Sequence, residues 1–324
     1  FKQRTRDQRP DRLAQDVLWK SNQELAILEK KLVRGIKPRR TPIVFICLCP
    51  RSGSTVLSQV LARTGGFNYI SNTLARFWNA PYIGGILERE LNVKADYARI
   101  SLNSEFGISD QPMDPHEFGY FWERWFPNTL ATMSNAGQLK KVDQKLLRQE
   151  IHALLSLSEQ PLLIKSGLAC MNIGFLAKLF PQSYFVVIKR KYPYIAQSLY
   201  KCRVRRYGRA GTWWSIKPRN YRTLMRKDCY QQIAGQIIET YRDMDEQLQT
   251  IPARKVLRLD YEEFCREPGR HIKAVFKLIK TQPPKGWQAH VPKSLTINNR
   301  RTLPLKEFQR LRAALADYAE TQAS

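Results

Sequence analysis

The chain has 324 residues, of which 43% are hydrophobic and 25% are charged, and this ordinary globular composition excludes a mainly disordered chain. No stretch approaches the roughly 18 consecutive apolar residues of a membrane-spanning helix. The formal charge of +26 predicts an anionic partner, such as a polyphosphorylated cofactor, an acidic glycan, a nucleic acid or an anionic membrane surface.

The first 40 residues are basic and polar, and we treat them as a separate N-terminal helical segment. Apolar residues recur in it at rough helical spacing, which predicts a surface helix from about Asp11 to Arg34. Such a helix usually packs on its own domain, but peripheral contact with a membrane or a partner is the alternative. Residues 41–324 are predicted to form a single α/β domain. The helical spacing is carried by Leu13, Val17, Leu28 and Leu32.

Short apolar runs alternate with helical patterns along the rest of the chain. This alternation predicts a parallel sheet with helices on both faces. We therefore expect an α/β protein with a P-loop-like three-layer fold, in which a central parallel sheet is flanked by helices. The predicted strands are Ile43–Cys49, Leu162–Ile164, Tyr184–Ile188 and Val256–Leu259, and the predicted helices are Val56–Ala62, Phe118–Trp125, Met171–Leu179, Pro193–Arg203, Gln231–Leu248, His271–Ile279 and Leu305–Tyr318.

Polar or cationic residues stand where three of these strands end. A polar turn at 50–55 follows the first strand, Lys165 follows the second and Arg190 follows the third. In an open parallel sheet, ligands bind outside the carboxyl ends of the strands. These side chains therefore predict an anion site at this edge of the sheet.

The turn Pro50-Arg-Ser-Gly-Ser-Thr55 joins the first strand to a helix. Backbone N–H groups at a helix N-terminus bind phosphate with help from the helix dipole, and Gly53 allows a close approach of the backbone. The usual P-loop of kinases has a lysine where Ser54 stands. Here the cation comes earlier, at Arg51. The turn therefore predicts a phosphate cradle that differs from a kinase loop.

The segment Pro50-Arg-Ser-Gly-Ser-Thr-Val-Leu57 resembles the 5′-phosphosulfate-binding loop of sulfotransferases that use 3′-phosphoadenosine-5′-phosphosulfate (PAPS). In that family the loop holds the 5′-phosphate, and its basic residue neutralises charge on the leaving phosphate. The family also has an Arg at a strand end, followed eight residues later by a Ser, and these two residues bind the 3′-phosphate. Arg190 and Ser198 have this spacing. The resemblance implies cofactor contacts by Arg51, Ser52, Gly53, Ser54, Thr55, Val56, Arg190 and Ser198.

Two further segments extend the resemblance. Val256–Phe264 is similar to the family's strand followed by Tyr-Glu, which implies that Tyr261 lies near the cofactor nucleotide. Leu163-Ile-Lys-Ser166 is similar to the strand that brings a Lys to the active site, so Lys165 would contact the sulfuryl group or the bridging oxygen. Some members have a catalytic His two residues after this Lys, but here Gly167 stands there.

The resemblance covers roughly residues 42–280 and is closer to the bacterial and carbohydrate-type branch than to enzymes for small phenols. Relatives also have a basic segment near the C-terminus that contacts phosphate. Arg300 and Arg301 would take that role here, although the sequence match is poor.

The reaction implied by the resemblance is transfer of a sulfuryl group from PAPS to a hydroxyl, which leaves the desulfated product PAP and needs no metal. It requires an in-line acceptor, a base and cations that stabilise the leaving phosphate. Arg51 and Lys165 would supply the positive charge. Some members place a Glu after the first helix, but the segment Asn68–Thr73 has no carboxylate.

The candidates for the base are therefore His116 and Glu117, in the stretch Asp114–Trp122. The alternative is that both are an exposed polar pair at the start of a helix. Three other carboxylates are less favoured, namely Glu88, Glu90 and Glu105.

Residues 201–227 contain ten Lys or Arg and no acid. Aromatic rings between cations suit sugars that bear carboxylates or sulfates, and they also suit single-stranded nucleic acid. A solvated basic segment with buried tryptophans would give the same pattern. We expect the acceptor to be a glycan, a glycolipid or a related metabolite, with no nucleic acid as partner. The aromatic residues are Tyr207, Trp213, Trp214 and Tyr221.

Two other functions remain open. A P-loop nucleotide kinase or NTPase would have a lysine in place of Ser54 and a metal-binding Asp at a strand end, where only Asp260 stands. A basic nucleic-acid-binding protein would use residues 201–227. Neither explains why Arg190 and Ser198 accompany the turn at 50–55.

The six cysteines form no Cys-x-x-Cys pair and have no cluster of histidines beside them, so a zinc site is not expected. We expect reduced cysteines and a cytoplasmic location, with membrane association as an open alternative. The chain does not begin with Met, so the question of a removed targeting segment stays open, as do the acceptor and the oligomeric state.

Overall fold

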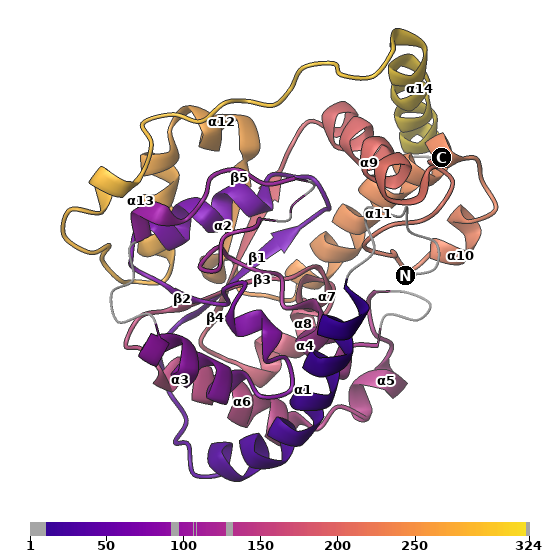
Figure 1. Cartoon of the computed structure of the whole chain (residues 1–324). Coiled ribbons are helices and arrows are strands. Elements are labelled where there is room, and N and C mark those ends of the chain that lie inside the picture. Colours follow the sequence, from indigo (N-terminus) through magenta and orange to yellow (C-terminus); the bar gives the residue numbers. More distant parts are fainter. Residues whose placement is uncertain (1–10, 92–96, 106, 108, 128–131, 322–324) are drawn as a thin grey trace.

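The structure is a computed structural model that describes residues 11–91, 97–105, 107, 109–127 and 132–321 (Figure 1). Its centre is a parallel sheet with the strand order β2-β3-β1-β4-β5. This confirms the predicted fold class. The shortest strand, β2, was missed because two residues are too few to give an apolar run. The strands are β1 (Ile43–Leu48), β2 (Asn68–Tyr69), β3 (Leu162–Lys165), β4 (Ser183–Lys189) and β5 (Val256–Asp260).

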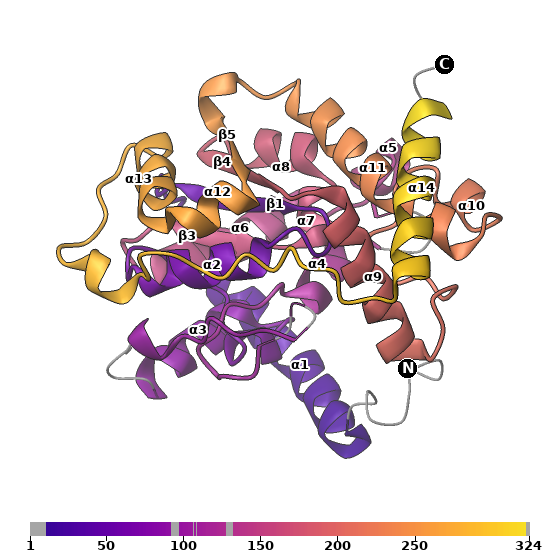
Figure 2. The same ribbon diagram turned by 90° about the horizontal axis from the view of Figure 1, so that it is seen from above.

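Helices surround the sheet and extend beyond it at both ends of the chain (Figures 1 and 2). The α-helices are α1 (Arg12–Val33), α2 (Ser54–Arg63), α3 (Pro81–Leu91), α4 (Gly119–Trp125), α5 (Ala136–Lys140), α6 (Gln144–Ser156), α7 (Gly167–Cys170), α8 (Ile173–Leu179), α9 (Tyr192–Tyr207), α10 (Tyr221–Leu224), α11 (Cys229–Leu248), α12 (Tyr261–Arg266), α13 (Pro268–Leu278) and α14 (Leu305–Thr321). Short 3₁₀ turns are η2 (Leu74–Arg76), η3 (Tyr97–Arg99), η4 (Ala253–Lys255) and η5 (Trp287–His290).

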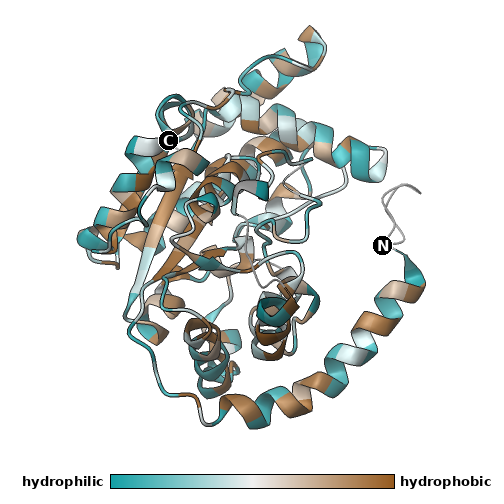
Figure 3. Cartoon of the chain, turned by 60° about the vertical axis from the view of Figure 1, so that its left-hand side comes forward, coloured by the Kyte–Doolittle hydropathy of each residue, from teal (hydrophilic) through white to brown (hydrophobic). Residues whose placement is uncertain are grey.

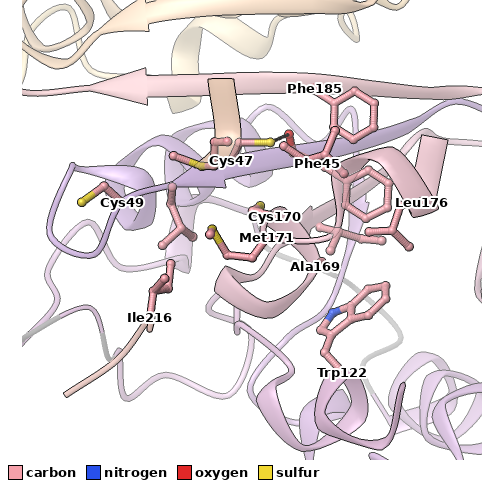
Figure 4. Packing of buried hydrophobic residues seen from close by; sticks show 14 of the residues in the cluster. Phe45, Cys47, Cys49, Trp122, Ala169, Cys170, Met171, Leu176, Phe185 and Ile216 are labelled. Atoms are coloured by element: carbon pink, nitrogen blue, oxygen red, sulfur yellow. Dashed lines mark hydrogen bonds between the residues drawn. The ribbon is translucent and has the colours of Figure 1, made fainter. Parts of the chain in front are cut away.

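Two hydrophobic cores lie on opposite faces of the sheet, because successive side chains of a strand point to opposite faces. Phe45 of β1 faces α4, α6, α7, α8, α9 and α11, whereas Val44 faces α2, α12 and α13. In the first core, the ring of Phe45 stacks on Phe185 with centroids 5.6 Å apart and meets the edge of Trp122 (Figure 4). Burial on both faces explains why the strands are continuous apolar runs. The cysteines are free, and Cys47 is buried as expected.

Most helix boundaries differ from the sequence-based prediction by one to four residues, and two of the differences have a local cause. The predicted helix Met171–Leu179 corresponds to α8 (Ile173–Leu179), and the short helix α7 (Gly167–Cys170) before it was not predicted. Asn172 lies between the two helices, and its side-chain amide donates to the carbonyl of Leu168 (2.9 Å). A short polar side chain that bonds nearby backbone competes with the helical hydrogen bonds. Helix α9 continues past Arg203 and ends only at Gly208, which has φ 75°.

Helix α1 packs on the domain through apolar residues, among them Leu18 and the fully buried Val33, and through two polar side chains. Asn22 and Glu29 are buried, and both accept hydrogen bonds from backbone N–H groups of the segment 79–83, where α3 begins. Because the first N–H groups of a helix have no intrahelical partner, the carboxylate of Glu29 also stabilises the start of α3. The helix itself was predicted correctly, but the apolar spacing that predicted it lies on the other, solvent-exposed side.

Two buried carboxylates share one cation beneath α1. Arg124 of α4 donates to Glu150 of α6 (3.0 Å), and its charge also lowers the pKa of Glu29. Burial outweighs this effect and raises the pKa of Glu29 and of Glu150 to about 7 in each case, with mutual repulsion adding to the rise for Glu150. The folded protein therefore binds protons more tightly than the unfolded chain between about pH 4.5 and pH 7.

We expect the free energy of unfolding to fall as pH rises through this window, since each pKa unit corresponds to about 1.4 kcal/mol. Between pH 5 and pH 8 the free energy of unfolding should fall by about 1–3 kcal/mol less in Glu150→Gln than in the wild type, as measured by urea unfolding at both pH values. The matched control is Glu159→Gln, which removes a carboxylate from an exposed pair with Arg39. Its free energy of unfolding should change with pH as that of the wild type does. An identical pH profile for Glu150→Gln would contradict this account.

Candidate active site

The turn between β1 and α2 has a backbone that suits close approach of an anion. Arg51 and Gly53 both have positive φ, of 71° and 97°, and Gly53 precedes the first residue of α2. A Cβ atom at Gly53 would lie 2.3 Å from the ring of Tyr261, so only glycine fits. The N–H groups of the first helical turn have no intrahelical partner and are therefore available to a phosphate.

Arg51 connects the turn to both elements of the predicted second anchor. Its Nε donates to Ser198 Oγ (2.8 Å) on α9, and its carbonyl accepts from Nη1 of Arg190 (3.1 Å). A left-handed conformation costs a non-glycine residue about 1–2 kcal/mol, and these two contacts offset it. The structure thus brings Arg51, Ser198 and Arg190 together at the carboxyl ends of β1 and β4.

Arg190 follows β4 and is 9% exposed. Beside its bond to Arg51, its Nε donates to Asn299 Oδ1 (3.0 Å) and its Nη2 donates to the carbonyl of Asn298. Its guanidinium lies 4.8 Å from the ring centroid of Tyr261, which separates it from Gly53. Burial lowers the pKa of Arg190. A guanidinium has five N–H donors, so these three bonds leave two for a ligand.

Residues 291–304 form an extended segment, here called the C-terminal strap, that crosses the carboxyl edge of the sheet between α13 and α14 (Figure 2). Gln197 of α9 holds it through the backbone of Arg300, Thr302 and Leu303. The sequence pointed to Arg300 and Arg301, but both are exposed, and Arg301 donates to the carbonyl of Leu303. The residues that reach Arg190 are Asn298 and Asn299, which sequence reasoning missed because they carry no charge.

Lys165 occupies the end of β3, beside the phosphate cradle. It is 3% exposed, and its Nζ lies 3.0 Å from Thr55 Oγ1 and 3.2 Å from the carboxylate of Glu117. The carboxylate is more open, with 46% of the Glu117 side chain exposed. The lysine thus joins the buried cradle to a carboxylate at the protein surface, and the structure brings three predicted residues into one cluster.

Glu117 reaches this position because residues 115–117 run beside the segment that follows α2. Ser71 forms a β-bridge with Pro115, and the N–H of His116 donates to the carbonyl of Ile70 (2.8 Å). Phe118 then adopts φ 54° and turns the chain into α4. The segment after α2 has no carboxylate of its own, but residues 115–117, which run beside it, supply the carboxylate of Glu117.

His116 lies beside Glu117, but its imidazole is already engaged. Its Nδ1 accepts from the N–H of Phe118 (2.9 Å), which places the proton of the neutral ring on Nε2. Removal from water lowers the pKa of His116 to about 4, and the charges of Lys165 and Arg76 act in the same direction. More than a third of the residue remains exposed, which limits this effect. In this arrangement the ring offers a donor rather than a lone pair.

Part of the basic segment 201–227 has a structural role. Arg203 is fully buried, and its guanidinium lies 4.8 Å from the ring of Trp213, which is itself 9% exposed. Burial lowers the pKa of Arg203 to about 10. These two residues are therefore closed to a ligand. The oxygens that accept from Arg203 are the carbonyl of Ala210 (3.1 Å) and the side-chain oxygens of Gln232 (3.0 Å) and Gln236 (2.9 Å).

A second part of this segment lies beside the site. Arg206 follows Ser198 by eight residues, which is about two turns of α9 and places both on one face. Its guanidinium lies 6.0 Å from the ring of Trp214, and both residues are half-buried. The same loop brings Ile216 against Gly167, two residues after Lys165. Arg206 and Trp214 are thus connected to the site through Ser198 on the same helix and through the contact of Ile216 with Gly167.

The remaining candidates lie in other interactions. Glu88 accepts from Ser71, Glu90 pairs with Arg89 (3.7 Å) and Glu105 is exposed. Asp260 caps α12 by accepting from the N–H of Glu263 (2.9 Å), which is a structural role rather than that of a metal ligand in a kinase. Ser52 lies in the turn between β1 and α2, and Val56 lies in the first turn of α2.

Metal-binding clusters and membrane-spanning helices are both absent from the described part of the chain. No group of three or more His, Cys, Asp or Glu side chains in it could hold a metal ion. None of the helices among the same residues is long and apolar enough to cross a membrane.

Comparisons with known proteins agree with the geometry. The sequence profile of the Sulfotransferase family matches residues 42–282, which is most of the chain. Curated proteins gave no significant sequence match. The sulfotransferase STF9 from Mycobacterium avium has a similar structure, with a TM-score of 0.55, 14% identity and coverage of 96% of this chain and 86% of that one. The sulfotransferase STF1 from Mycobacterium tuberculosis H37Rv has a TM-score of 0.52, 11% identity and coverage of 89% and 81%. At these identities the likeness establishes the fold.

Proposed function

Because the chain belongs to the sulfotransferase family, we propose that it transfers a sulfuryl group from PAPS to a hydroxyl of an anionic glycan, glycolipid or related metabolite. The observation that carries the proposal is the position of Lys165. Its ammonium group lies between Thr55 of the phosphate cradle and the exposed carboxylate of Glu117. A cation between a phosphate site and a base open to solvent is what sulfuryl transfer needs.

The donor set fits PAPS at two separate points. The turn at 50–55 and the N-terminus of α2 would hold the 5′-phosphosulfate, with Arg51 beside it. Arg190 and Ser198 would hold the 3′-phosphate, since two donors of the guanidinium remain and a bidentate contact with phosphate is favourable. The buried ring of Tyr261 contacts both points, because it lies against Gly53 and under the guanidinium of Arg190, and it supports their relative placement.

The chemistry is divided among a few side chains. When bound, PAPS supplies the activated sulfuryl group, whose bond to the 5′-phosphate breaks as a bond to the acceptor oxygen forms. Glu117 takes the proton of the acceptor hydroxyl. Lys165 has a third N–H for a sulfuryl oxygen or the bridging oxygen, and Arg51 balances the charge left on the phosphate. His116 donates through Nε2 rather than acting as the base.

The acceptor surface favours an anionic sugar. Arg206 has no carboxylate partner among the residues that the structure describes, and its Nε is buried without a hydrogen bond. Trp214 beside it is half-buried. An acidic group paired with Arg206 and a sugar ring against Trp214 would orient a hydroxyl toward Glu117.

The free cysteines support a cytoplasmic location for this reaction.

The proposal is tested by isothermal titration calorimetry with PAP and with ADP. We expect PAP to bind at least about tenfold more tightly than ADP, because only PAP has a 3′-phosphate for Arg190. Transfer from ³⁵S-labelled PAPS is then measured to a uronic-acid polysaccharide and to a neutral glucan, with wild type and Arg206→Ala. Label should enter the acidic polymer, and the variant should lose most of this preference.

The two parts of this experiment fail separately. Equal affinities for PAP and ADP would overturn the use of PAPS and would favour a nucleotide kinase. Tight PAP binding with label in the neutral glucan, or with a preference that Arg206→Ala leaves unchanged, would overturn the anionic acceptor and leave the cofactor assignment intact.

A further inference from the structure

Helix α1 presents an apolar stripe to solvent. Leu13 and Val17 are 74% and 56% exposed, and Leu28 and Leu32 are 48% and 43% exposed. The two pairs are separated by eleven residues, which is close to three helical turns, so all four lie on one face. Exposed apolar residues that line up on one face differ from the single exposed residues found on most protein surfaces.

The opposite face of α1 fixes the helix to the domain. Asn22 and Glu29 make buried hydrogen bonds to backbone groups before and at the start of α3. These polar contacts act together with the buried Val33 and with Leu18, which packs against the first core. Within the part of the chain that the structure describes, the four stripe residues remain exposed to solvent, and Figure 3 shows the brown residues of α1 at the periphery of the molecule.

Positive charge lies along one edge of the stripe. Lys20 and Lys31, both exposed, each follow a stripe residue by three positions and so lie beside it. Glu24 lies between the two halves of the stripe as an opposing charge. Residues 1–40 contain twelve Lys or Arg against five Asp or Glu, and the whole chain carries +26. An apolar face with a basic edge matches an anionic lipid surface better than a protein core.

Aromatic contacts connect this helix to the candidate active site. Trp19 of α1 packs on Trp78 with ring centroids 5.8 Å apart, and Trp78 packs on Tyr120 at 5.0 Å. Tyr120 lies three residues after Glu117, on α4. Trp19 is 53% exposed and Tyr120 is 39% exposed. A surface that binds α1 would therefore also lie near the side of the molecule from which an acceptor reaches Glu117.

We propose that α1 binds the protein peripherally to an anionic membrane surface, with Leu13, Val17, Leu28 and Leu32 inserted among the lipids and with Lys20 and Lys31 at the headgroups. The stripe is too polar overall to span a bilayer, and it gives reversible association rather than insertion. The binding places Glu117 near acceptors at the membrane surface. This proposal concerns α1 alone and does not require the proposed chemistry to be correct.

The test is flotation of the full chain with phosphatidylserine–phosphatidylcholine vesicles and with phosphatidylcholine vesicles. We expect binding to the anionic vesicles that falls at high salt, and little binding to the neutral ones. Leu28→Glu/Leu32→Glu and, separately, Lys20→Glu/Lys31→Glu should each lower the affinity by about tenfold or more. The matched control is Leu305→Glu, at a residue 55% exposed on α14, which should bind like the wild type.

Folding is checked by circular dichroism and by PAP affinity, both of which should be unchanged in all three variants. Failure of the wild type to float with anionic vesicles would overturn the proposal, as would equal loss of binding in the Leu305 control. A dimer in light scattering that dissociates in Leu28→Glu/Leu32→Glu, without vesicle binding by the wild type, would assign the stripe to self-association instead. If the wild type does not bind PAP, the proposed function is overturned, but the membrane-binding proposal is not affected.

Discussion

Arg190→Ala is expected to remove the preference of the protein for PAP over ADP. The guanidinium is 9% exposed and is held by Arg51, by the ring of Tyr261 and by the C-terminal strap, so it is already placed for a 3′-phosphate. Hydrogen bonds to a charged group contribute about 1.5–3 kcal/mol each, so loss of two should weaken PAP binding by about 100-fold or more. ADP has no phosphate at its 3′ position, so its affinity should be nearly unchanged.

Two control variants separate this effect from damage to the surroundings. Lys191→Ala removes the neighbouring exposed positive charge and should keep the preference for PAP. Asn299→Ala releases one strap contact of Arg190 but leaves the guanidinium, and it should also keep the preference. Calorimetric titration of all four proteins gives the answer. A parallel loss of PAP and ADP affinity in Arg190→Ala would mean that the residue only supports the fold.

The positions of the residues in the proposed cofactor half of the site could be predicted from sequence, because these residues are adjacent in the chain to strand ends. Parallel strands carry their carboxyl ends to one edge of the sheet, so the turn at 50–55, Lys165, Arg190 and Tyr261 had to lie along it. The strand order β3-β1-β4-β5 then places Lys165, the turn, Arg190 and Tyr261 side by side in that order along the edge. The local sequence pattern and the sheet topology together determine these positions, so no contact between distant segments had to be predicted.

The rest of the site depends on contacts between distant segments that carry no local signal. Asn298 and Asn299 reach Arg190 only because the strap crosses the sheet edge, and an Asn pair in an extended segment looks like any polar loop. The choice between His116 and Glu117 could not be made from sequence. It depends on which way each side chain points after the left-handed turn at Phe118.

The apolar pattern of α1 shows a further limit. Helical spacing of leucines predicts a helix, but it does not say whether the domain covers the apolar face. Here Asn22 and Glu29 satisfy backbone groups at the start of α3, and such specific hydrogen bonds decided the orientation of the helix. In the same way, Arg203 and Trp213 look like ligand-binding residues in sequence but support each other inside the protein.

Glu117→Gln is expected to lower the rate of sulfuryl transfer by about 10²- to 10⁴-fold, the usual effect of losing a general base. The amide keeps the shape of the side chain and an oxygen that can still accept from Lys165, but it cannot take the proton of the acceptor hydroxyl. PAP affinity should be close to that of the wild type, because the carboxylate does not belong to the phosphate cradle. The measurement is transfer from ³⁵S-labelled PAPS under single-turnover conditions, with PAP titrated in parallel.

His116→Ala distinguishes the two candidates. Because Nδ1 of His116 is occupied by the N–H of Phe118 and burial lowers its pKa, its removal should reduce the rate by less than about tenfold. The opposite order, with His116→Ala inactive and Glu117→Gln active, would assign proton transfer to the histidine and would require its ring to turn away from Phe118 when substrates bind. A loss of PAP affinity in Glu117→Gln would show instead that the carboxylate serves mainly to hold Lys165 against the cradle, because the catalytic loss would then follow the loss of binding.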